Sequence, residues 1–171
     1  MYIDNCMRLQ VICASLTSMA AEPTADTIAA WTRLMRTQQA MLARVEEALK
    51  RAGHPALEWY DVLYELDMAE RGWLRQADVN ARVLLAQYNL SRLVDRMARE
   101  GLLERRQCPV DGRNNVLSIT PKGRELRARM WPVYAGAIEA HMGAHLAEGE
   151  ARSLAELLAK LLAAQRSAPP A

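Results

Sequence analysis

The chain has 171 residues, of which 51% are hydrophobic and 25% are charged, as in ordinary soluble globular proteins. No apolar run approaches the roughly 18–20 residues that a membrane span needs, so we expect no membrane contact. The N-terminus is a poor signal peptide, and three cysteines at no framework spacing favour a reducing compartment, so we expect a cytoplasmic protein.

The net charge is only +2, but the charges are distributed unevenly. Residues 71–130 hold 13 Lys and Arg against 6 Asp and Glu, whereas residues 1–70 hold 6 against 10 and residues 131–171 hold 3 against 4. A local basic stretch is typical of a nucleic-acid binder, although a solvated basic face without a partner gives the same pattern. The middle of the chain is therefore the first candidate for a binding surface.

The first half of the chain is predicted to be helical after a short extension. Residues 1–22 show no convincing period and are interpreted as disordered or loosely attached. From residue 26, apolar residues recur at spacings of three, four and seven, which predicts a helix of about 25 residues that ends at Gly53 and Pro55. Further helices are predicted over residues 57–72, 74–85 and 86–101, the last of them ended by Gly101.

A single β-hairpin is predicted after these helices. Residues 116–120 alternate as in a half-buried strand, residues 103–107 can pair with them, and the polar tip between them is rich in turn residues. A lone hairpin is marginally stable in water, so it must pack against helices. Thr120 and Pro121 then predict the N-cap and first position of a long helix to about residue 146, which precedes an amphipathic helix over residues 148–165 and a disordered tail over residues 167–171.

Two short helices, a tight turn and a hairpin describe a helix-turn-helix with a wing. The predicted fold class is therefore mainly α (α+β), with a winged helix-turn-helix DNA-binding domain over residues 57–123. Residues 23–56 and 124–166 are predicted to form a helical dimerisation region. Their apolar stripes would stay exposed in a monomer, so we expect a homodimer.

The sequence resembles the MarR (multiple antibiotic resistance regulator) family of winged helix-turn-helix regulators. The resemblance rests on NLSRLVDRMAREGLLERR (residues 89–106) and DGRNNVLSITPKGREL (residues 111–126), which match the family's pattern of helix end, glycine, arginine pair, Asp-x-Arg tip and strand exit. The sequence departs from the family at Leu84 and Ala86, where Gly and a Ser or Thr N-cap are common, and at Gly112, where a basic residue is common. The resemblance implies a DNA-binding regulator, a repressor that a small aromatic or phenolic ligand releases.

We expect DNA contacts from the second helix of the helix-turn-helix, which enters the major groove, and from the basic wing. The candidates are Gln87, Tyr88, Asn89, Ser91, Arg92, Arg96, Arg105 and Arg113. Arg96 is expected to contact a phosphate or to form an ion pair with Asp95 or Glu100, and Asp111 and Gly112 are expected to shape the wing turn. The expected partner is double-stranded DNA with a pseudo-palindromic operator, because a two-fold dimer presents two identical reading helices.

The resemblance also implies an effector pocket between the dimerisation and DNA-binding parts. Its candidate lining residues, each of which also fits an ordinary core position, are Trp31, Met35, Trp59, Tyr60 and Tyr134. No phosphate loop, nucleophile elbow or catalytic carboxylate pair is present, so we expect no enzyme activity and no cofactor. His141 and His145 lie four residues apart, but the segment between them lacks the metalloprotease glutamate, and we expect no metal.

Two alternatives stay open at this point. A winged-helix module can bind a protein partner without touching DNA. The second alternative is a redox-responsive regulator that senses oxidants through the thiol of Cys108, beside the basic wing. Binding to duplex DNA separates the first alternative from a DNA-binding regulator.

Overall fold

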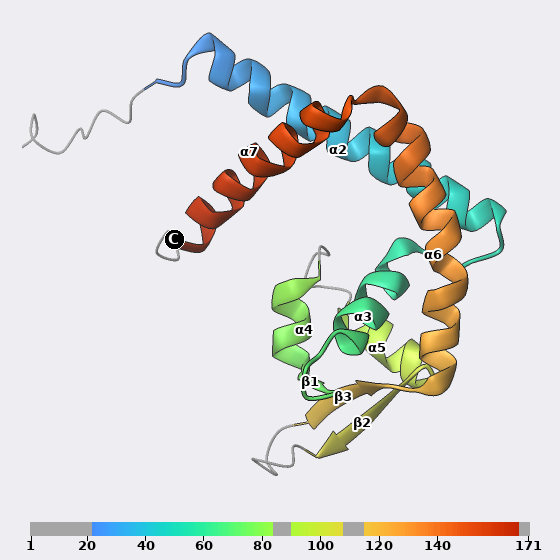
Figure 1. The fold of residues 1–171 in the computed structure, drawn as a ribbon. Coiled ribbons are helices and arrows are strands. Elements are labelled where there is room, and N and C mark those ends of the chain that lie inside the picture. Colours follow the sequence, from blue (N-terminus) through green and yellow to red (C-terminus); the bar gives the residue numbers. More distant parts are fainter. Residues whose placement is uncertain (1–21, 84–89, 108–114, 168–171) are drawn as a thin grey trace, which may run out of the picture. The chain divides into compact units, whose positions relative to one another are not determined.

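The computed structural model of the chain describes residues 22–83, 90–107 and 115–167 (Figure 1). It divides into two units, residues 1–39 and 40–171, and each is described by itself. The predicted N-terminal extension and C-terminal tail lie outside the described residues, apart from residues 22 and 167. No helix in the described ranges is long and apolar enough to cross a membrane.

The first helix of the sequence prediction is confirmed as α2 (Ala25–Arg51), which begins in the first unit and ends in the second. At its start, the Thr27 N–H donates to the Thr24 hydroxyl at 3.2 Å. At its end, Gly53 has a φ of +73°, and the His54 N–H donates to the Leu49 carbonyl at 2.9 Å. This left-handed glycine closes the helix in the way that the sequence predicts.

Helix α3 (Leu57–Asp67) is the most deeply buried helix of the second unit. Its six buried residues are Leu57, Trp59, Tyr60, Val62, Leu63 and Leu66. No local side chain caps its first turn; instead the Glu46 carboxylate of α2 accepts the Leu57 N–H at 3.0 Å. At the other end, the Asp67 carboxylate forms ion pairs with Arg124 at 2.8 Å and with Arg127 at 2.7 Å, both in helix α6 (Pro121–His141). Polar contacts therefore fix both ends of α3.

The prediction of a lone hairpin is wrong, because a third strand joins it. Strands β2 (Leu103–Gln107) and β3 (Asn115–Ile119) form the predicted antiparallel pair, and β1 (Leu74–Arg75) pairs with the other edge of β3. Leu117 lies at the centre of the sheet, opposite Leu74 on one side and Arg105 on the other. Residues 74 and 75 are predicted from the sequence as part of a helix, because two residues are too few to show the alternation of apolar and polar side chains that marks a strand.

The helix-turn-helix consists of α4 (Gln76–Arg82) and α5 (Leu90–Arg99). Helix α4 begins only after β1, later than predicted, and α3 ends at Asp67 instead of near Gly72. The predicted start of the second helix, over residues 86–89, lies outside the described residues. Val79 of α4 and Leu93, Val94 and Met97 of α5 are fully buried in the core. Gly101, with a φ of +70°, ends α5 as predicted.

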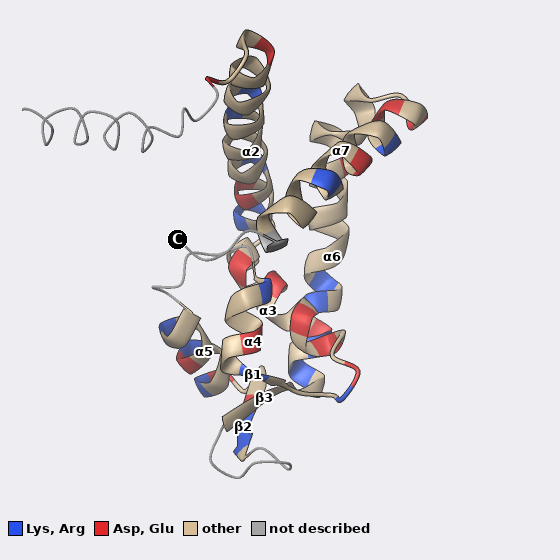
Figure 2. Ribbon diagram, turned by 90° about the vertical axis from the view of Figure 1, so that its left-hand side faces the viewer, with Lys and Arg blue, Asp and Glu red and all other residues tan. Residues whose placement is uncertain are grey.

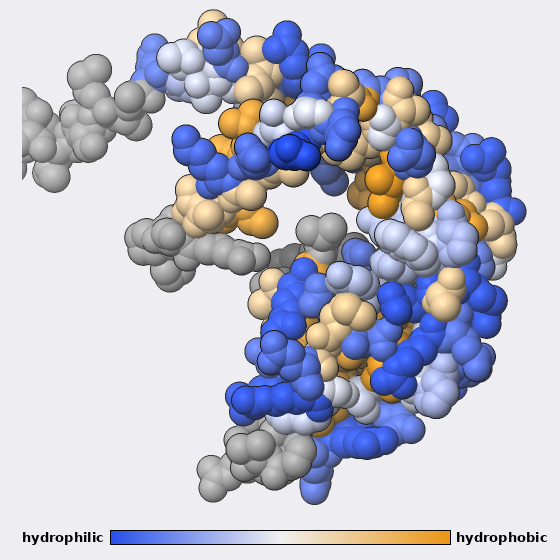
Figure 3. Space-filling view, in the orientation of Figure 1, coloured by the Kyte–Doolittle hydropathy of each residue, from blue (hydrophilic) through white to orange (hydrophobic). Residues whose placement is uncertain are grey.

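After the sheet come α6 (Pro121–His141), a short 3-10 turn (Gly143–His145) and α7 (Glu148–Ser167). The predicted cap is confirmed, because the Thr120 hydroxyl accepts the Gly123 N–H at 3.1 Å and Pro121 follows it. The long helix stops at His141, earlier than the predicted residue 146. No side chain described on α7 is buried, and hydrophobic residues lie at its surface (Figure 3).

Candidate nucleic-acid interface

The exposed face of α5 is rich in charged side chains. Leu90, Leu93, Val94 and Met97 face the core, so the remaining positions of this short helix point outward. Its exposed residues are Ser91, Arg92, Asp95, Arg96 and Arg99. In the coloured ribbon of Figure 2, basic and acidic positions alternate along this helix, and further basic positions lie on β2. Arginine is the residue that most often contacts both phosphates and guanine in DNA.

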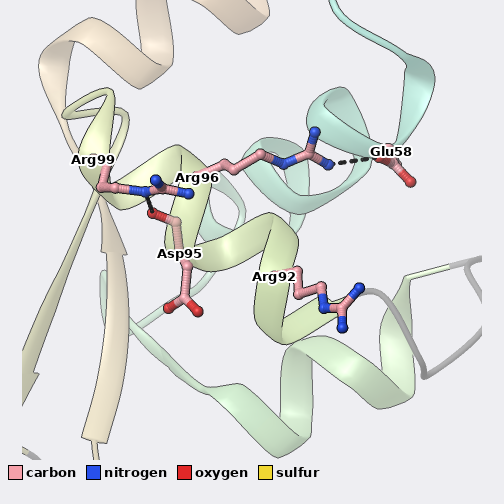
Figure 4. Close-up of a pocket in the computed structure, with 5 residues that line it drawn as sticks. All are labelled: Glu58, Arg92, Asp95, Arg96 and Arg99. Atoms are coloured by element: carbon pink, nitrogen blue, oxygen red, sulfur yellow. Dashed lines mark hydrogen bonds and ion pairs between the residues drawn. The ribbon is translucent and has the colours of Figure 1, made fainter.

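One side of α5 is tied to α3 through Arg96. The Arg96 guanidinium lies 3.7 Å from the Glu58 carboxylate and 5.9 Å from the centre of the Trp59 ring (Figure 4). Both partners lie in the first turn of α3, where Trp59 is one of the buried residues. The ion-pair partner of Arg96 is therefore Glu58 rather than the expected Asp95 or Glu100. The expected contact of Arg96 with DNA stays a prediction.

The other side of α5 is tied to the wing through Arg105. Its guanidinium reaches from β2 to the Asp95 carboxylate at 2.6 Å. Ser91, at the first turn of α5, is in turn fixed to α4, because the Gln76 amide donates to its hydroxyl at 3.0 Å. Side chains from α3, α4 and β2 therefore hold α5 on three sides.

The end of α5 is anchored to the start of α6. Three successive carbonyls, those of Glu100, Gly101 and Leu102, each accept a hydrogen bond from this segment. The Lys122 ammonium donates to the first at 2.7 Å, the Thr120 hydroxyl to the second at 2.7 Å, and the Thr120 N–H to the third at 3.1 Å. These carbonyls lie in the turn that follows α5, so the donors satisfy backbone groups that would otherwise need water.

A hollow of about 480 Å³ opens along the outer face of α5. Figure 4 shows its lining residues, which are Glu58, Arg92, Asp95, Arg96 and Arg99. Arg99 donates through Nε to the Asp95 carbonyl of its own helix at 3.3 Å. Arg92 has no ion pair with any residue in the described ranges. The hollow is open, polar and positively charged, which suits an extended anion better than an enclosed apolar ligand.

Comparisons with known proteins identify this arrangement. Residues 54–114 match the MarR family. A stretch of 65 residues is 32% identical to the HTH-type transcriptional regulator YkoM of Bacillus subtilis, and it spans 38% of this chain and 42% of that protein. The MarR family regulator Sco5413 of Streptomyces coelicolor has the same fold with a TM-score of 0.67 and 28% identity, over 85% of this chain and 100% of that one. Residues 54–114 of this chain are therefore similar to MarR family regulators.

Two further solved structures share the MarR fold. The regulator Sco3205 of Streptomyces coelicolor, solved in complex with DNA, has a TM-score of 0.73 and 23% identity over 85% of this chain and 91% of that one. BpsR of Bordetella bronchiseptica, whose DNA binding is regulated by 6-hydroxynicotinic acid, has a TM-score of 0.68 and 21% identity over 88% of this chain and 100% of that one. The MarR family consists of transcriptional regulators rather than enzymes.

Several residues with predicted roles fall outside the described ranges. They are Gln87, Tyr88 and Asn89 before α5, and Asp111, Gly112 and Arg113 at the wing tip, together with Cys108. Their roles remain predictions. Ser91, Arg92, Arg96 and Arg105 lie together on or beside α5, as the resemblance implies. Sequence reasoning missed Arg99, although its position seven residues after Arg92 places both on one helical face.

A second group of side chains joins α3 to α6. The Tyr60 and Tyr134 rings meet edge to face with centroids 5.2 Å apart, and Tyr64 and Trp131 each stack on Tyr60 at 6.1 Å. Burial raises the pKa of Tyr60. Burial is also the main cause that raises the pKa of Tyr134, and the negative charge of Asp61 raises it further. Tyr64 and Trp131 were not predicted, although each lies one helical turn from a predicted residue.

The predicted effector-pocket residues are therefore divided. Tyr60 and Tyr134 are brought together, whereas the Trp59 ring lies against Arg96 of α5. Trp31 and Met35 belong to the first unit, where their side chains are 63% and 39% exposed. The assignment of all five residues to one pocket stays a prediction.

Proposed function

We propose that this chain is a MarR family transcription regulator that binds a pseudo-palindromic site in double-stranded DNA as a homodimer. In this proposal, residues 57–123 bind DNA, and residues 23–56 and 124–166 pair with a second copy. The single observation that carries the proposal is the outer face of α5, where arginines line an open hollow on a helix held by α3, α4 and β2. A helix held in this way can enter a major groove without losing its orientation.

The charge distribution and the DNA-bound relative support this proposal. Residues 71–130 hold 13 Lys and Arg against 6 Asp and Glu. A basic surface attracts DNA before any sequence is read, because neutralising phosphates releases counterions. Sco3205, which has the same fold, was solved with DNA bound. Exposed leucines on α7 support the homodimer, since a monomer would leave them in water.

We further propose that a small aromatic ligand releases the DNA, and that the protein acts as a repressor. The aromatic group on α3 and α6 supports a ligand of this kind, because Tyr64 and Trp131 stack on a buried tyrosine while remaining 43% and 48% exposed. Aromatic rings stack favourably on such partly exposed faces. The DNA binding of the similarly folded BpsR responds to 6-hydroxynicotinic acid, an aromatic acid.

The test is a selection of bound fragments from a random duplex library, followed by titration of the recovered site and a scrambled copy. We expect a two-fold symmetric site that is bound at least a hundred-fold more tightly than the scrambled duplex. Arg92→Ala should weaken binding, and Arg152→Ala on α7 is the control that should leave it unchanged. Equal affinity of the unmodified chain for both duplexes would contradict sequence-specific binding and favour a protein-interaction module.

The same titration tests the ligand. Aromatic acids added to the complex should release the selected duplex, and Trp131→Ala should raise the concentration needed. A ligand can shift the binding equilibrium only through its different affinities for the free and DNA-bound states. Release that persists unchanged in the variant would place the ligand elsewhere.

A further inference from the structure

Five exposed arginines lie on α5 and β2. Arg106 pairs with Glu104 of its own strand, and two others are paired with carboxylates of neighbouring elements. Arg96 is held by Glu58 at 3.7 Å, and Arg105 by Asp95 at 2.6 Å. A carboxylate this close neutralises most of the field of its guanidinium at the distance of an approaching phosphate. These two arginines therefore contribute shape and orientation to the surface more than attraction.

Arg92 and Arg99 keep their charge available. Arg99 bonds only to a backbone carbonyl of its own helix, at 3.3 Å, and no described carboxylate pairs with Arg92. In Figure 4, the Arg92 guanidinium lies apart from the Glu58–Arg96 pair. The five guanidinium groups of α5 and β2 include three that pair with a carboxylate, namely Glu58, Asp95 or Glu104. The two positive charges that are left reside on Arg92 and Arg99.

The spacing of Arg92 and Arg99 suits two separate phosphates. Seven residues make almost two turns, so both side chains leave α5 on the same face, about 10 Å apart along the axis. The major groove is about 12 Å wide, so a helix within it carries such side chains toward different points of the sugar–phosphate backbone. Both residues line the hollow along α5, which leaves room for an extended anion.

We propose that Arg92 and Arg99 each bind a backbone phosphate of DNA, whereas Arg96 and Arg105 are positioning residues that hold α5 to α3 and to β2. This inference rests on the proposed DNA binding and deepens it. It adds Arg99 to the expected DNA contacts. It also gives Arg96 and Arg105, which the sequence predicts as direct DNA contacts, an indirect role through the position of α5.

The salt dependence of DNA binding tests this division of roles. Arg99→Gln should weaken binding to the selected and scrambled duplexes alike, by about five-fold per subunit at 0.15 M salt, and lower the slope of log K against log salt by about 0.9 per subunit. Arg99→Lys keeps the charge and should restore the slope. The unchanged melting temperature of each variant serves as the folding control, because Arg99 is exposed.

Arg105→Gln is the matched comparison, since it removes the same charge from the same surface. It should leave the salt slope unchanged and reduce the ratio of affinities for the selected and scrambled duplexes, because α5 loses its orientation. Arg105→Lys can remake the pair with Asp95 and should recover that ratio. Arg96→Gln should behave like Arg105→Gln.

The possible failures are distinguishable. If the unmodified chain binds the selected duplex but Arg99→Gln changes neither affinity nor slope, the phosphate role is wrong while the proposed function stands. If Arg105→Gln lowers the slope as much as Arg99→Gln does, the positioning role is wrong. An unmodified chain that binds neither duplex overturns both the proposed function and this inference.

Discussion

At the scale of single residues, Asp61 stands out because its environment favours the uncharged acid. Burial, followed by the charges of Glu65 and Glu46, raises its pKa to about 6, from about 3.9 in an unfolded chain. The folded chain therefore binds this proton more tightly than the unfolded chain does. The resulting contribution to stability is complete below pH 4 and is lost as the pH rises through 6.

Asp61→Asn should therefore stabilise the protein mainly above pH 6. The amide keeps the shape of the protonated acid and cannot ionise, so the variant avoids the cost of a buried charge at pH 8 and gains little at pH 4.5. Thermal unfolding at these two pH values measures the difference. Glu47→Gln, which alters an exposed carboxylate of α2, is the control. A gain for Asp61→Asn that is equal at both pH values would contradict the raised pKa.

At the scale of elements, the packing of α6 against the turn after α5 and against β3 depends on the absence of a side chain at Gly123. A Cβ at this position would lie 2.1 Å from the Leu102 carbonyl oxygen and 2.9 Å from Ile119 Cγ1. Backbone cannot move aside as a flexible side chain can, so the first turn of α6 approaches the Leu102 carbonyl this closely only because residue 123 is glycine.

Gly123→Ala should consequently destabilise the protein by at least about 2 kcal/mol, as overpacking does in cores. It should also weaken DNA binding, because α5 would shift relative to α6. Gly136→Ala is the matched control in the same helix; nothing lies within 4 Å of its added Cβ, so it should stabilise by about 0.5–1 kcal/mol. Denaturant unfolding of the two variants gives both values, and similar values would refute the close contact.

At the scale of the whole molecule, the described helices leave apolar side chains in water. On α7, Leu157, Leu161 and Leu162 are 62%, 54% and 56% exposed. On α2, Ile28 and Trp31 are 52% and 63% exposed within the first unit. Surfaces of this kind favour association, and burying them between two copies would stabilise the homodimer that we propose.

Leu161→Glu should therefore shift the protein toward monomer, since a charge at this position would have to be buried between the copies. Ala159→Glu adds the same charge to the same exposed helix, away from the leucine stripe, and is the control. Sedimentation at micromolar concentration should give the mass of one chain for the first variant and of two for the second. Two chains for both variants would exclude this face of α7 from the interface.

The sequence alone determined what depends on neighbouring residues. The period of α2, the left-handed Gly53 and Gly101, the Thr120 cap and the β2–β3 pair all follow from short-range patterns, and the structure confirms them. The motif of residues 89–106 indicated the family for the same reason. These features involve residues within a few turns of each other, so local sequence carries nearly all the information.

Only the tertiary structure decided which side chains meet. Two residues of β1 join the sheet through β3, some forty residues later in the chain, without a strand period of their own. Asp67 binds Arg124, which lies 57 residues away, and Glu58 rather than an adjacent acid binds Arg96. An exposed arginine has many possible partners in the sequence, and the backbone geometry selects one. On α5, that selection leaves Arg92 and Arg99 without a carboxylate among the described residues. It therefore distinguishes the arginines that we expect to contact DNA from those that hold the helix in place.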